Sequence, residues 1–245
     1  MCGRARLSTD FSEIKLVFKL PPEQPVPNFA PTYNLAPTDP IPIVRYDAGA
    51  VSRNLVIARW GLIPYWAKDI KIGYSTFNAR CEDLEQKPAF REAFKRRRCL
   101  IPLDNFYEWK KLGSKEKQPY AIALKDGGLM AMAGLWENWR SPTNETMRSA
   151  TIITCPPNDL VAGLHDRMPV ILPPEAWPVW LGEEPADAAR LKGLLVPYPV
   201  EGLAIWPVDK RVGNVKNNAE RRRVAWRTRC TTCSRSWRPP GRCGA

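Results

Sequence analysis

The residue with the clearest chemical potential is a cysteine at position 2, in the opening sequence Met1-Cys2-Gly3-Arg4. Its small side chain permits removal of Met1, which would leave Cys2 with a free α-amine beside its thiol. An α-amine titrates near ~7.7–8.0 and a thiol near ~8.5, so both are partly nucleophilic at neutral pH. The amine can condense with an aldehyde to a Schiff base, and the thiol can then close a thiazolidine ring. By its position alone, however, Cys2 is better explained as an ordinary second residue.

Two further residues could move protons for such a reaction. Glu108 lies in the aromatic run Phe106-Tyr107-Glu108-Trp109, where partial desolvation would raise its pKa toward a value useful for acid–base catalysis. The alternative is a surface carboxylate on an edge strand beside Lys110 and Lys111. His165 is the only histidine of the chain, so a multi-histidine metal site is excluded and one side chain is suited to titrate near neutrality. A lone histidine is otherwise most often structural.

Several short motifs follow one another in a fixed order along the chain. With Met1-Cys2-Gly3-Arg4 in front, the order and spacing of these motifs resemble the SOS-response-associated peptidase (SRAP) family, whose members protect abasic sites in single-stranded DNA. The resemblance covers roughly residues 1–220, and the motifs that carry it are Tyr33-Asn34-Leu35-Ala36-Pro37, Trp60-Gly61-Leu62-Ile63-Pro64-Tyr65-Trp66-Ala67, Phe77-Asn78-Ala79-Arg80, Phe106-Tyr107-Glu108-Trp109, Leu164-His165-Asp166-Arg167-Met168-Pro169 and Val212-Gly213-Asn214-Val215-Lys216-Asn217.

The resemblance implies a catalytic group made of Cys2, Asn78, Glu108 and His165. It implies that Cys2, after loss of Met1, crosslinks covalently to the aldehyde of an abasic site, with Glu108 as proton shuttle. His165 would protonate the ring oxygen and open the cyclic sugar. Asn78 offers a donor and an acceptor that could orient Cys2 or the sugar, although an asparagine at this point also suits a turn.

The partner implied is single-stranded DNA containing abasic sites. Arg80 and Arg167 are the best candidates to hold phosphates, because a guanidinium matches phosphate geometry and stays charged, and Arg4 is a weaker third. For each of them an internal ion pair or a solvated position is the alternative. Trp66 and Tyr65 could stack on bases at a gain of ~1–3 kcal/mol per base without regard to sequence. Pro37 is implied to line the same groove.

The elements that must position these residues are mostly strands. Runs rich in β-branched or aromatic residues, bounded by Gly, Pro, Asp and Lys, predict strands at Ile41–Tyr46, Leu55–Trp60, Cys99–Leu103, Phe106–Lys110, Tyr120–Leu124, Leu129–Trp136 and Ala150–Cys155. Helical spacing predicts helices at Asp10–Leu20, Pro88–Arg97 and Pro174–Leu181. Asp126-Gly127-Gly128 predicts a hairpin turn between two of the strands. The chain is therefore predicted to be an α+β protein, a single domain built on a mostly antiparallel, barrel-like sheet with flanking helices.

Composition limits the remaining function classes. The net charge is +12, but eight arginines and no acidic residue follow Glu220, which leaves residues 1–220 with only +4. We expect residues 1–220 to form the domain and residues 221–245 to be a basic tail without a fold.

Seven cysteines without an export signal predict reduced thiols rather than disulfides, and Cys230-Thr231-Thr232-Cys233 lacks the second pair of a zinc site. We expect a cytoplasmic monomer without membrane contact, metal or cofactor, associated with the nucleoid if bacterial.

Two other function classes stay open at this stage. Glutamine amidotransferases also begin Met-Cys-Gly and use the α-amine as a base, so an N-terminal-nucleophile cysteine amidohydrolase is possible, although no glutamine-binding motif follows. A noncovalent single-strand-binding module would use Trp66 and the arginines but would leave Cys2, Glu108 and His165 without a role.

Overall fold

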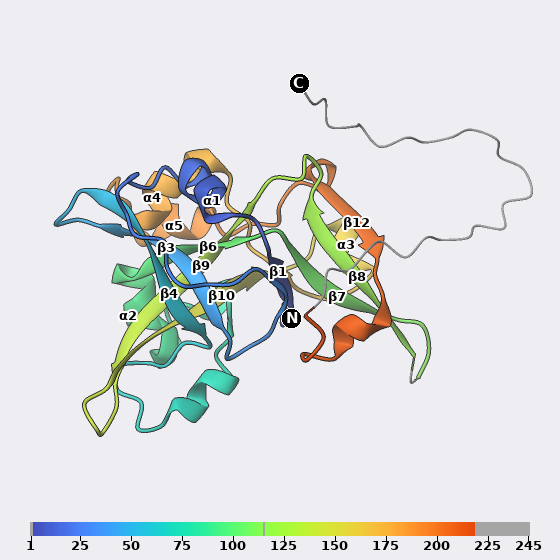
Figure 1. Cartoon of the computed structure of the whole chain (residues 1–245), viewed down its shortest axis with the longest axis horizontal. Helices are drawn as coiled ribbons and strands as arrows, with labels where there is room; N and C mark the ends of the chain where they lie inside the picture. Colours follow the sequence, from blue (N-terminus) through green and yellow to red (C-terminus); the bar gives the residue numbers. More distant parts are fainter. Residues whose placement is uncertain (1, 115, 219–245) are drawn as a thin grey trace, which may run out of the picture.

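Five strands of the computed structural model, which describes residues 2–114 and 116–218, close into a barrel (Figure 1). The pairing runs β10–β4–β3–β6–β9 and returns to β10, and only the β10–β4 contact is parallel. The strands are β3 (Pro40–Asp47), β4 (Ser52–Trp60), β6 (Arg98–Leu103), β9 (Met130–Arg140) and β10 (Thr146–Cys155). Closure pairs every barrel strand on both sides, so the barrel presents no long free edge.

Two short strands extend the barrel beside the last residues of β10. β5 (Asn78–Arg80) runs parallel to β10 with Asn78 opposite Ile152, and β11 (Met168–Pro169) runs antiparallel with Met168 opposite Cys155. Residues from three distant parts of the sequence therefore meet at one end of β10.

A second sheet is antiparallel throughout and has the order β12–β8–β7–β1–β2. Its strands are β1 (Ala5–Leu7), β2 (Thr32–Leu35), β7 (Asn105–Lys111), β8 (Lys117–Leu124) and β12 (Leu203–Pro207). Figure 1 shows this sheet on one side of the molecule and the barrel on the other, with β1 between them. β1 has only three residues and lies between β7 and β2, so its position depends on neighbours on both sides.

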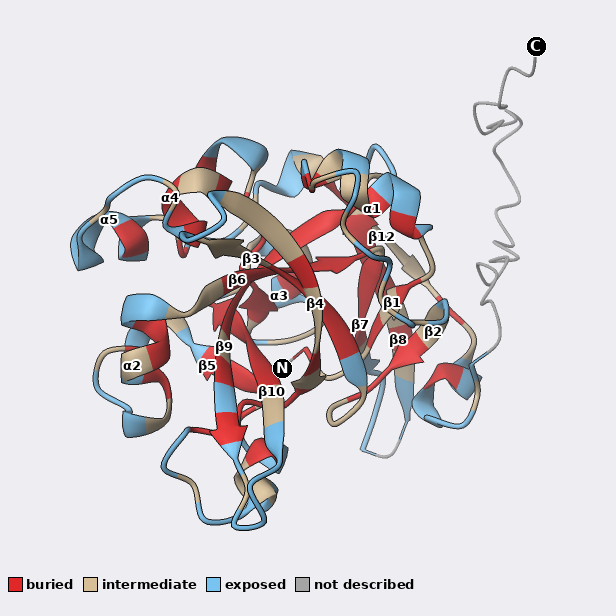
Figure 2. Ribbon diagram, turned by 60° about the vertical axis from the view of Figure 1, so that its left-hand side comes forward, coloured by how far each residue is buried: buried red, intermediate tan, exposed pale blue. Residues whose placement is uncertain are grey.

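The helices are short and lie around the strands. They are α1 (Phe11–Val17), α2 (Pro88–Arg96), α3 (Asp159–Ala162), α4 (Trp177–Leu181) and α5 (Ala188–Gly193), with 3-10 turns η1 (Ile70–Tyr74), η2 (Cys81–Asp83), η3 (Pro174–Ala176), η4 (Val200–Gly202) and η5 (Lys210–Gly213). Asp10 caps α1 by accepting from the backbone N–H of Ser12 at 2.8 Å. Figure 2 shows that buried residues concentrate on the strands and on the inward sides of the helices.

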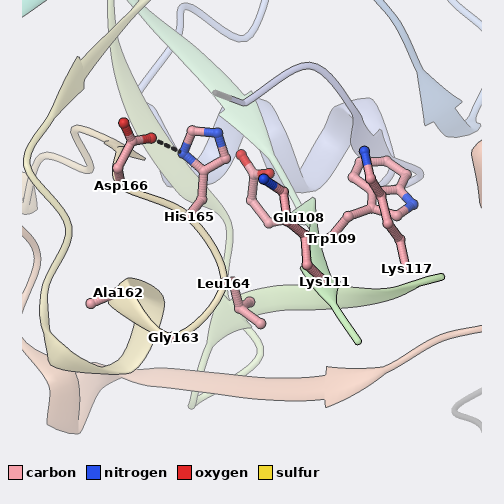
Figure 3. Close-up of a pocket in the computed structure, with 9 residues that line it drawn as sticks. All are labelled: Glu108, Trp109, Lys111, Lys117, Ala162, Gly163, Leu164, His165 and Asp166. Atoms are coloured by element: carbon pink, nitrogen blue, oxygen red, sulfur yellow. Dashed lines mark ion pairs between the residues drawn. The ribbon is translucent and has the colours of Figure 1, made fainter. Parts of the chain in front are cut away.

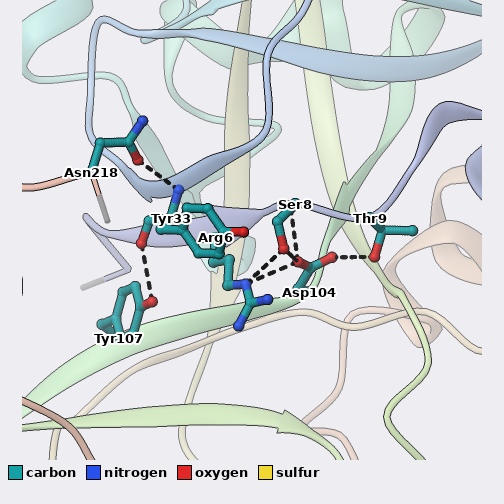
Figure 4. Close-up of polar contacts among 7 residues, drawn as sticks. All are labelled: Arg6, Ser8, Thr9, Tyr33, Asp104, Tyr107 and Asn218. Atoms are coloured by element: carbon teal, nitrogen blue, oxygen red, sulfur yellow. Dashed lines mark hydrogen bonds and ion pairs between the residues drawn. The ribbon is translucent and has the colours of Figure 1, made fainter. Parts of the chain in front are cut away.

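Asp104 fixes the chain that leaves β1 (Figure 4). Its carboxylate accepts from the backbone N–H of Ser8 at 2.8 Å, from the Ser8 hydroxyl at 2.7 Å and from the Thr9 hydroxyl at 2.7 Å. The Arg6 Nε lies 3.2 Å from the same carboxylate. These bonds to a charged acceptor compensate for the few backbone bonds that a three-residue strand can form.

The predicted strands and helices are confirmed, as is the α+β class with a barrel and flanking helices. The predicted hairpin at Asp126-Gly127-Gly128 is wrong. A turn is present, with Gly127 at φ +79° and the Gly128 N–H donating to the Asp126 carboxylate at 2.9 Å. However, the turn joins β8 of the second sheet to β9 of the barrel, because β8 pairs with β7 and β12 while β9 pairs with β6 and β10.

The predicted tail at residues 221–245, with its three cysteines, lies outside the described residues. Among the described residues, Cys2, Cys81, Cys99 and Cys155 are free thiols. None of the helices in the described part of the chain is both long enough and apolar enough to cross a bilayer.

Candidate functional site

The pairing of β1 with β7 brings the start of the chain to Glu108. Ala5 lies opposite Phe106, and the Tyr107 N–H donates to the Arg4 carbonyl at 2.9 Å. Continuing this antiparallel register toward the N-terminus carries Cys2 alongside the Glu108 region of β7. Cys2 is fully buried. Burial raises the pKa of its thiol, and the negative charge of nearby Glu108 raises that pKa further.

Asn78 approaches Cys2 from the barrel side. Its side-chain amide donates to the Cys2 carbonyl at 2.7 Å, and β5 holds it opposite Ile152 of β10. Asn78 is 9% exposed, and its Oδ1 is buried with no hydrogen-bond partner among the described residues. The Nδ2 group of the amide therefore orients Cys2. The Oδ1 atom is an acceptor that has lost its hydration without gaining a hydrogen bond from the described residues.

Glu108 is buried rather than being the surface carboxylate that its lysine neighbours would suggest, with 4% of its surface exposed. Burial raises its pKa from 4.5 to about 7, because the charged form loses hydration. The carboxyl group thus exchanges protons near neutrality, as a proton shuttle must.

His165 lies in the loop between α3 and β11, where its backbone N–H donates to the Val161 carbonyl at 3.0 Å. Its Nδ1 accepts from the Arg167 N–H at 3.0 Å and also lies 2.7 Å from the Asp166 carboxylate. When the neutral ring accepts the Arg167 N–H at Nδ1, its proton is on Nε2. When the ring is protonated, Nδ1 can donate to Asp166 instead. Burial lowers the pKa of His165, and Asp166 opposes that effect.

Glu108 and His165 face a common pocket of about 680 Å³ (Figure 3). The pocket is large enough for a nucleotide-sized ligand. Its lining is completed by Trp109, Lys111, Lys117, Ala162, Gly163, Leu164 and Asp166. Glu108 and Asp166 contribute acidic groups to the lining, and Lys111 and Lys117 contribute positive charge from β7 and β8, so the pocket can exchange protons with a bound molecule and attract an anion at the same time.

The arginines expected to bind phosphate have different surroundings. Arg80 is exposed at the end of β5. Arg167 forms a bidentate ion pair with Glu82, at 2.7 and 2.8 Å, and also donates to the Thr154 carbonyl at 2.6 Å. This pair lowers the pKa of Glu82 to about 2, so Glu82 stays charged at neutral pH.

Arg4 binds the C-terminal part of the described chain. It donates to the Asn34 side chain at 3.2 Å and to the carbonyls of Val212 and Gly213 at 3.2 and 3.4 Å. Asn34 in turn donates to the carbonyls of residues 214 and 217 at 2.9 and 3.0 Å. The motif around Asn34 and the motif at residues 212–217 therefore meet at Arg4, the residue directly before β1.

The aromatic residues expected to contact DNA are exposed. Tyr65 is 59% and Trp66 is 48% exposed, and Pro37 is half-buried. The Trp139 indole N–H anchors their segment by donating to the Ala67 carbonyl at 2.7 Å. These aromatics do not line the pocket, and neither do Arg4, Arg80 and Arg167.

Reasoning from the sequence did not identify Trp109, Lys111, Lys117 and Asp166 as parts of the site. Lys111 and Lys117 come together through the pairing of β7 with β8, which places them opposite each other and which the structure provides. Two lysines at a strand end are most often solvated, so their charge gave no reason to select them.

Comparison with known proteins gives consistent results. A family model described as SOS response associated peptidase (SRAP) matches residues 1–215. The abasic site processing protein YoqW of Bacillus subtilis is 43% identical over 219 residues, covering 89% of this chain and 97% of the relative. The abasic site processing protein HMCES of Xenopus tropicalis is 35% identical over 221 residues, covering 78% and 64%.

Two crystal structures share the fold. A protein from Bacteroides thetaiotaomicron superposes with a TM-score of 0.77 at 25% identity, covering 89% of this chain and all of that one. A protein from Bordetella bronchiseptica superposes with a TM-score of 0.72 at 29% identity, covering 85% of this chain and all of that one.

Proposed function

The chain belongs to the SOS response associated peptidase (SRAP) family, as its motifs predicted, and on that basis we propose that it processes abasic sites in single-stranded DNA. In this proposal Cys2 couples covalently to the aldehyde of the abasic sugar and shields the lesion. Relatives named as abasic site processing proteins match nearly the whole of this chain, which supports the substrate class.

The observation that carries the mechanism is the position of Cys2 beside a carboxyl group that titrates near neutrality. Glu108 has a pKa of about 7, and Asn78 holds the Cys2 backbone by a 2.7 Å hydrogen bond. Glu108 could therefore give protons to, and take them from, an α-amine created at Cys2.

Catalysis begins with removal of Met1, by a separate aminopeptidase or by the protein's own site. His165 donates a proton to the ring oxygen, which opens the abasic sugar to its aldehyde. The Cys2 amine attacks the aldehyde carbon to give a carbinolamine, whose hydroxyl leaves as water with a proton from Glu108, which leaves a protonated imine and ionised Glu108. The sulfur then adds to the imine carbon while the thiol proton passes to Glu108, and the nitrogen keeps its own proton as the thiazolidine closes.

The buried state of the Cys2 thiol determines how the last step proceeds. Because burial raises its pKa, a free thiolate would be costly at this position. The proton must leave sulfur as the C–S bond forms, and ionised Glu108 is the neighbouring acceptor. The product contains no aldehyde, so it cannot undergo the β-elimination that breaks a strand at an abasic site.

The experiment that tests this proposal is a denaturing gel of the protein with a single-stranded oligonucleotide carrying one abasic site. A shifted band that requires both the lesion and Cys2 is the expected result. Cys2→Ala should abolish the band, whereas Cys81→Ala, at a half-buried thiol of the same chain, should retain it. Mass spectrometry must show that Met1 is absent.

No shift from protein that has lost Met1 would overturn the covalent mechanism. Release of ammonia from glutamine by that protein would then favour an N-terminal-nucleophile amidohydrolase. Binding of DNA that survives Cys2→Ala but not denaturation would favour a noncovalent single-strand-binding module.

A further inference from the structure

Two lysines face each other across the strands that carry Glu108. Lys111 on β7 lies directly opposite Lys117 on β8, and both are exposed. Like charges at directly opposed positions of an antiparallel pair destabilise the sheet. Nearby Lys210 is neutralised by Glu116 at 2.7 Å, whereas neither Lys111 nor Lys117 forms an ion pair with a described residue. Folding alone thus gives no reason for this arrangement.

Both lysines belong to the pocket that contains Glu108 and His165. Figure 3 shows their side chains extending in the same direction as Glu108. The influence of Lys111 reaches the histidine, because after burial its positive charge is among the causes that lower the pKa of His165. Lys111 is thus close enough to act on His165, and Lys117 lies opposite it on the neighbouring strand.

The proposed substrate carries phosphates that Lys111 and Lys117 could bind. A sugar held between Glu108 and His165 carries a phosphate on each side, joined to it by covalent bonds. A phosphate could not lie against the carboxylates of Glu108 and Asp166 without strong repulsion. It would be stabilised at the lysines, where it would also remove the repulsion between them.

We propose that Lys111 and Lys117 together bind a phosphodiester next to the abasic sugar and so place its aldehyde carbon in the pocket. This inference rests on the proposed function and extends it to residues outside the group expected from the sequence. Arg167 is already neutralised by Glu82, so the lysine pair supplies positive charge where the pocket needs it.

The chain provides a matched control in Lys110. It is an exposed lysine next to Lys111 on the same strand, but it does not line the pocket. Neutralising Lys110 changes the overall charge by the same amount as neutralising Lys111. A difference between the two variants therefore reports position and not net charge.

The test measures noncovalent binding by full-length Cys2→Ala protein to a single-stranded oligonucleotide containing one tetrahydrofuran abasic analogue, across a range of KCl concentrations. Each phosphate contact contributes about 0.7 to the slope of log affinity against log salt for single strands. Changing both Lys111 and Lys117 to Gln should lower that slope by roughly 0.7 and weaken binding several-fold at low salt. Lys111→Gln alone should lower the slope, whereas Lys110→Gln, which removes the same single charge, should leave it unchanged. Replacing both Lys111 and Lys117 by Arg should preserve the slope.

An unchanged slope in the double Gln variant, or an equal loss in Lys110→Gln, would overturn the phosphate site. Melting temperatures of the variants exclude unfolding as the cause. The crosslinking gel with the Cys2-containing protein is scored separately. If the wild-type protein crosslinks but the double Gln variant has the same salt slope as its parent, only the lysine proposal fails. If the wild-type protein does not crosslink, the proposed function fails.

Discussion

The side-chain amide of Asn78 holds the backbone carbonyl of Cys2 at 2.7 Å, and this bond joins the two sheets at the candidate site. Asn78 belongs to β5 at the side of the barrel, whereas Cys2 precedes β1 of the second sheet. The position of Cys2 is therefore set by a contact between two separately paired sets of strands.

Replacing Asn78 by Asp should slow crosslinking. Aspartate keeps the size of the side chain but loses the N–H donor, and its charge would face the Cys2 carbonyl. Loss of a buried hydrogen bond that leaves its partner unsatisfied costs about 1–3 kcal/mol, so the rate should fall on the order of 10-fold. Single-turnover crosslinking at saturating DNA measures this rate. Asn138→Asp, at an exposed position of β9, should match wild type, and an equal loss there would reject the positioning role.

Replacing Glu108 by Gln should stabilise the fold increasingly as pH rises. The folded pKa of about 7 lies above the ordinary 4.5, so folding favours the protonated carboxyl group. Wild-type stability should therefore fall between pH 4.5 and 7, by up to about 3 kcal/mol, and then level off. The gap in melting temperature between Glu108→Gln and wild type should widen from pH 5 to pH 8. The exposed Glu23→Gln should show no such change, and a constant gap for Glu108→Gln would contradict the raised pKa.

The pKa of His165 can be measured without ambiguity, because the chain has no other histidine. Its ring proton resonances followed by NMR should titrate below the ordinary value of 6.5, since burial disfavours the charged ring. Asp166→Asn should lower the pKa further, because the carboxylate 2.7 Å from Nδ1 stabilises the charged form. If this substitution raised the pKa or left it unchanged, Asp166 would not be the partner of the protonated ring.

Trp66→Ala should weaken noncovalent binding of single-stranded DNA without destabilising the protein. The side chain is about half exposed, so its removal should change the free energy of unfolding by no more than about 0.5 kcal/mol. Loss of base stacking should cost about 1–3 kcal/mol of binding. Fluorescence anisotropy with the Cys2→Ala protein measures the affinity. Leu16→Ala, at an exposed apolar residue of α1, is the control, and equal affinities for both variants would exclude stacking by Trp66.

Glu82→Gln should strengthen binding of single-stranded DNA if Arg167 contacts a phosphate. Glu82 holds Arg167 in a bidentate pair and would compete with the phosphate for the guanidinium. Removing its charge should raise affinity several-fold at low salt, and Arg167→Ala should lower it. Salt titrations of the two variants separate these effects. If Glu82→Gln binds no better than wild type, the role of Arg167 is the internal ion pair.

The parts of the fold that could be predicted are those with a strong local pattern. The barrel strands β3, β4 and β10 are long, apolar and β-branched, so neighbouring residues specify them. β1, β2 and β5 have three or four residues each and no periodicity of their own. β1 pairs with β7, β2 pairs with β1, and β5 pairs with β10, and partners that are distant in the chain cannot be read from a local pattern. The turn at Asp126 shows the same limit, since its sequence fixes a turn but not the sheets it connects.

In the candidate site, too, the residue types could be predicted from the sequence, whereas their arrangement in space could not. Cys2, Asn78, Glu108 and His165 could be selected by residue type and motif order. Their convergence depends on the pairings of Ala5 with Phe106 and of Asn78 with Ile152, which only the structure provides. The internal pairing of Arg167 with Glu82 is likewise a contact between distant segments.

The bonds from Arg4 and Asn34 to residues 212–217 also determine when the fold around Cys2 can be completed during synthesis. Arg4 is separated from Val212 by 208 positions, and translation adds about 5–20 residues per second. For at least ten seconds of synthesis, Cys2 exists while the segment that secures its strand has not been made. The complete site is thus assembled only near the end of translation, and chains that stop early lack it.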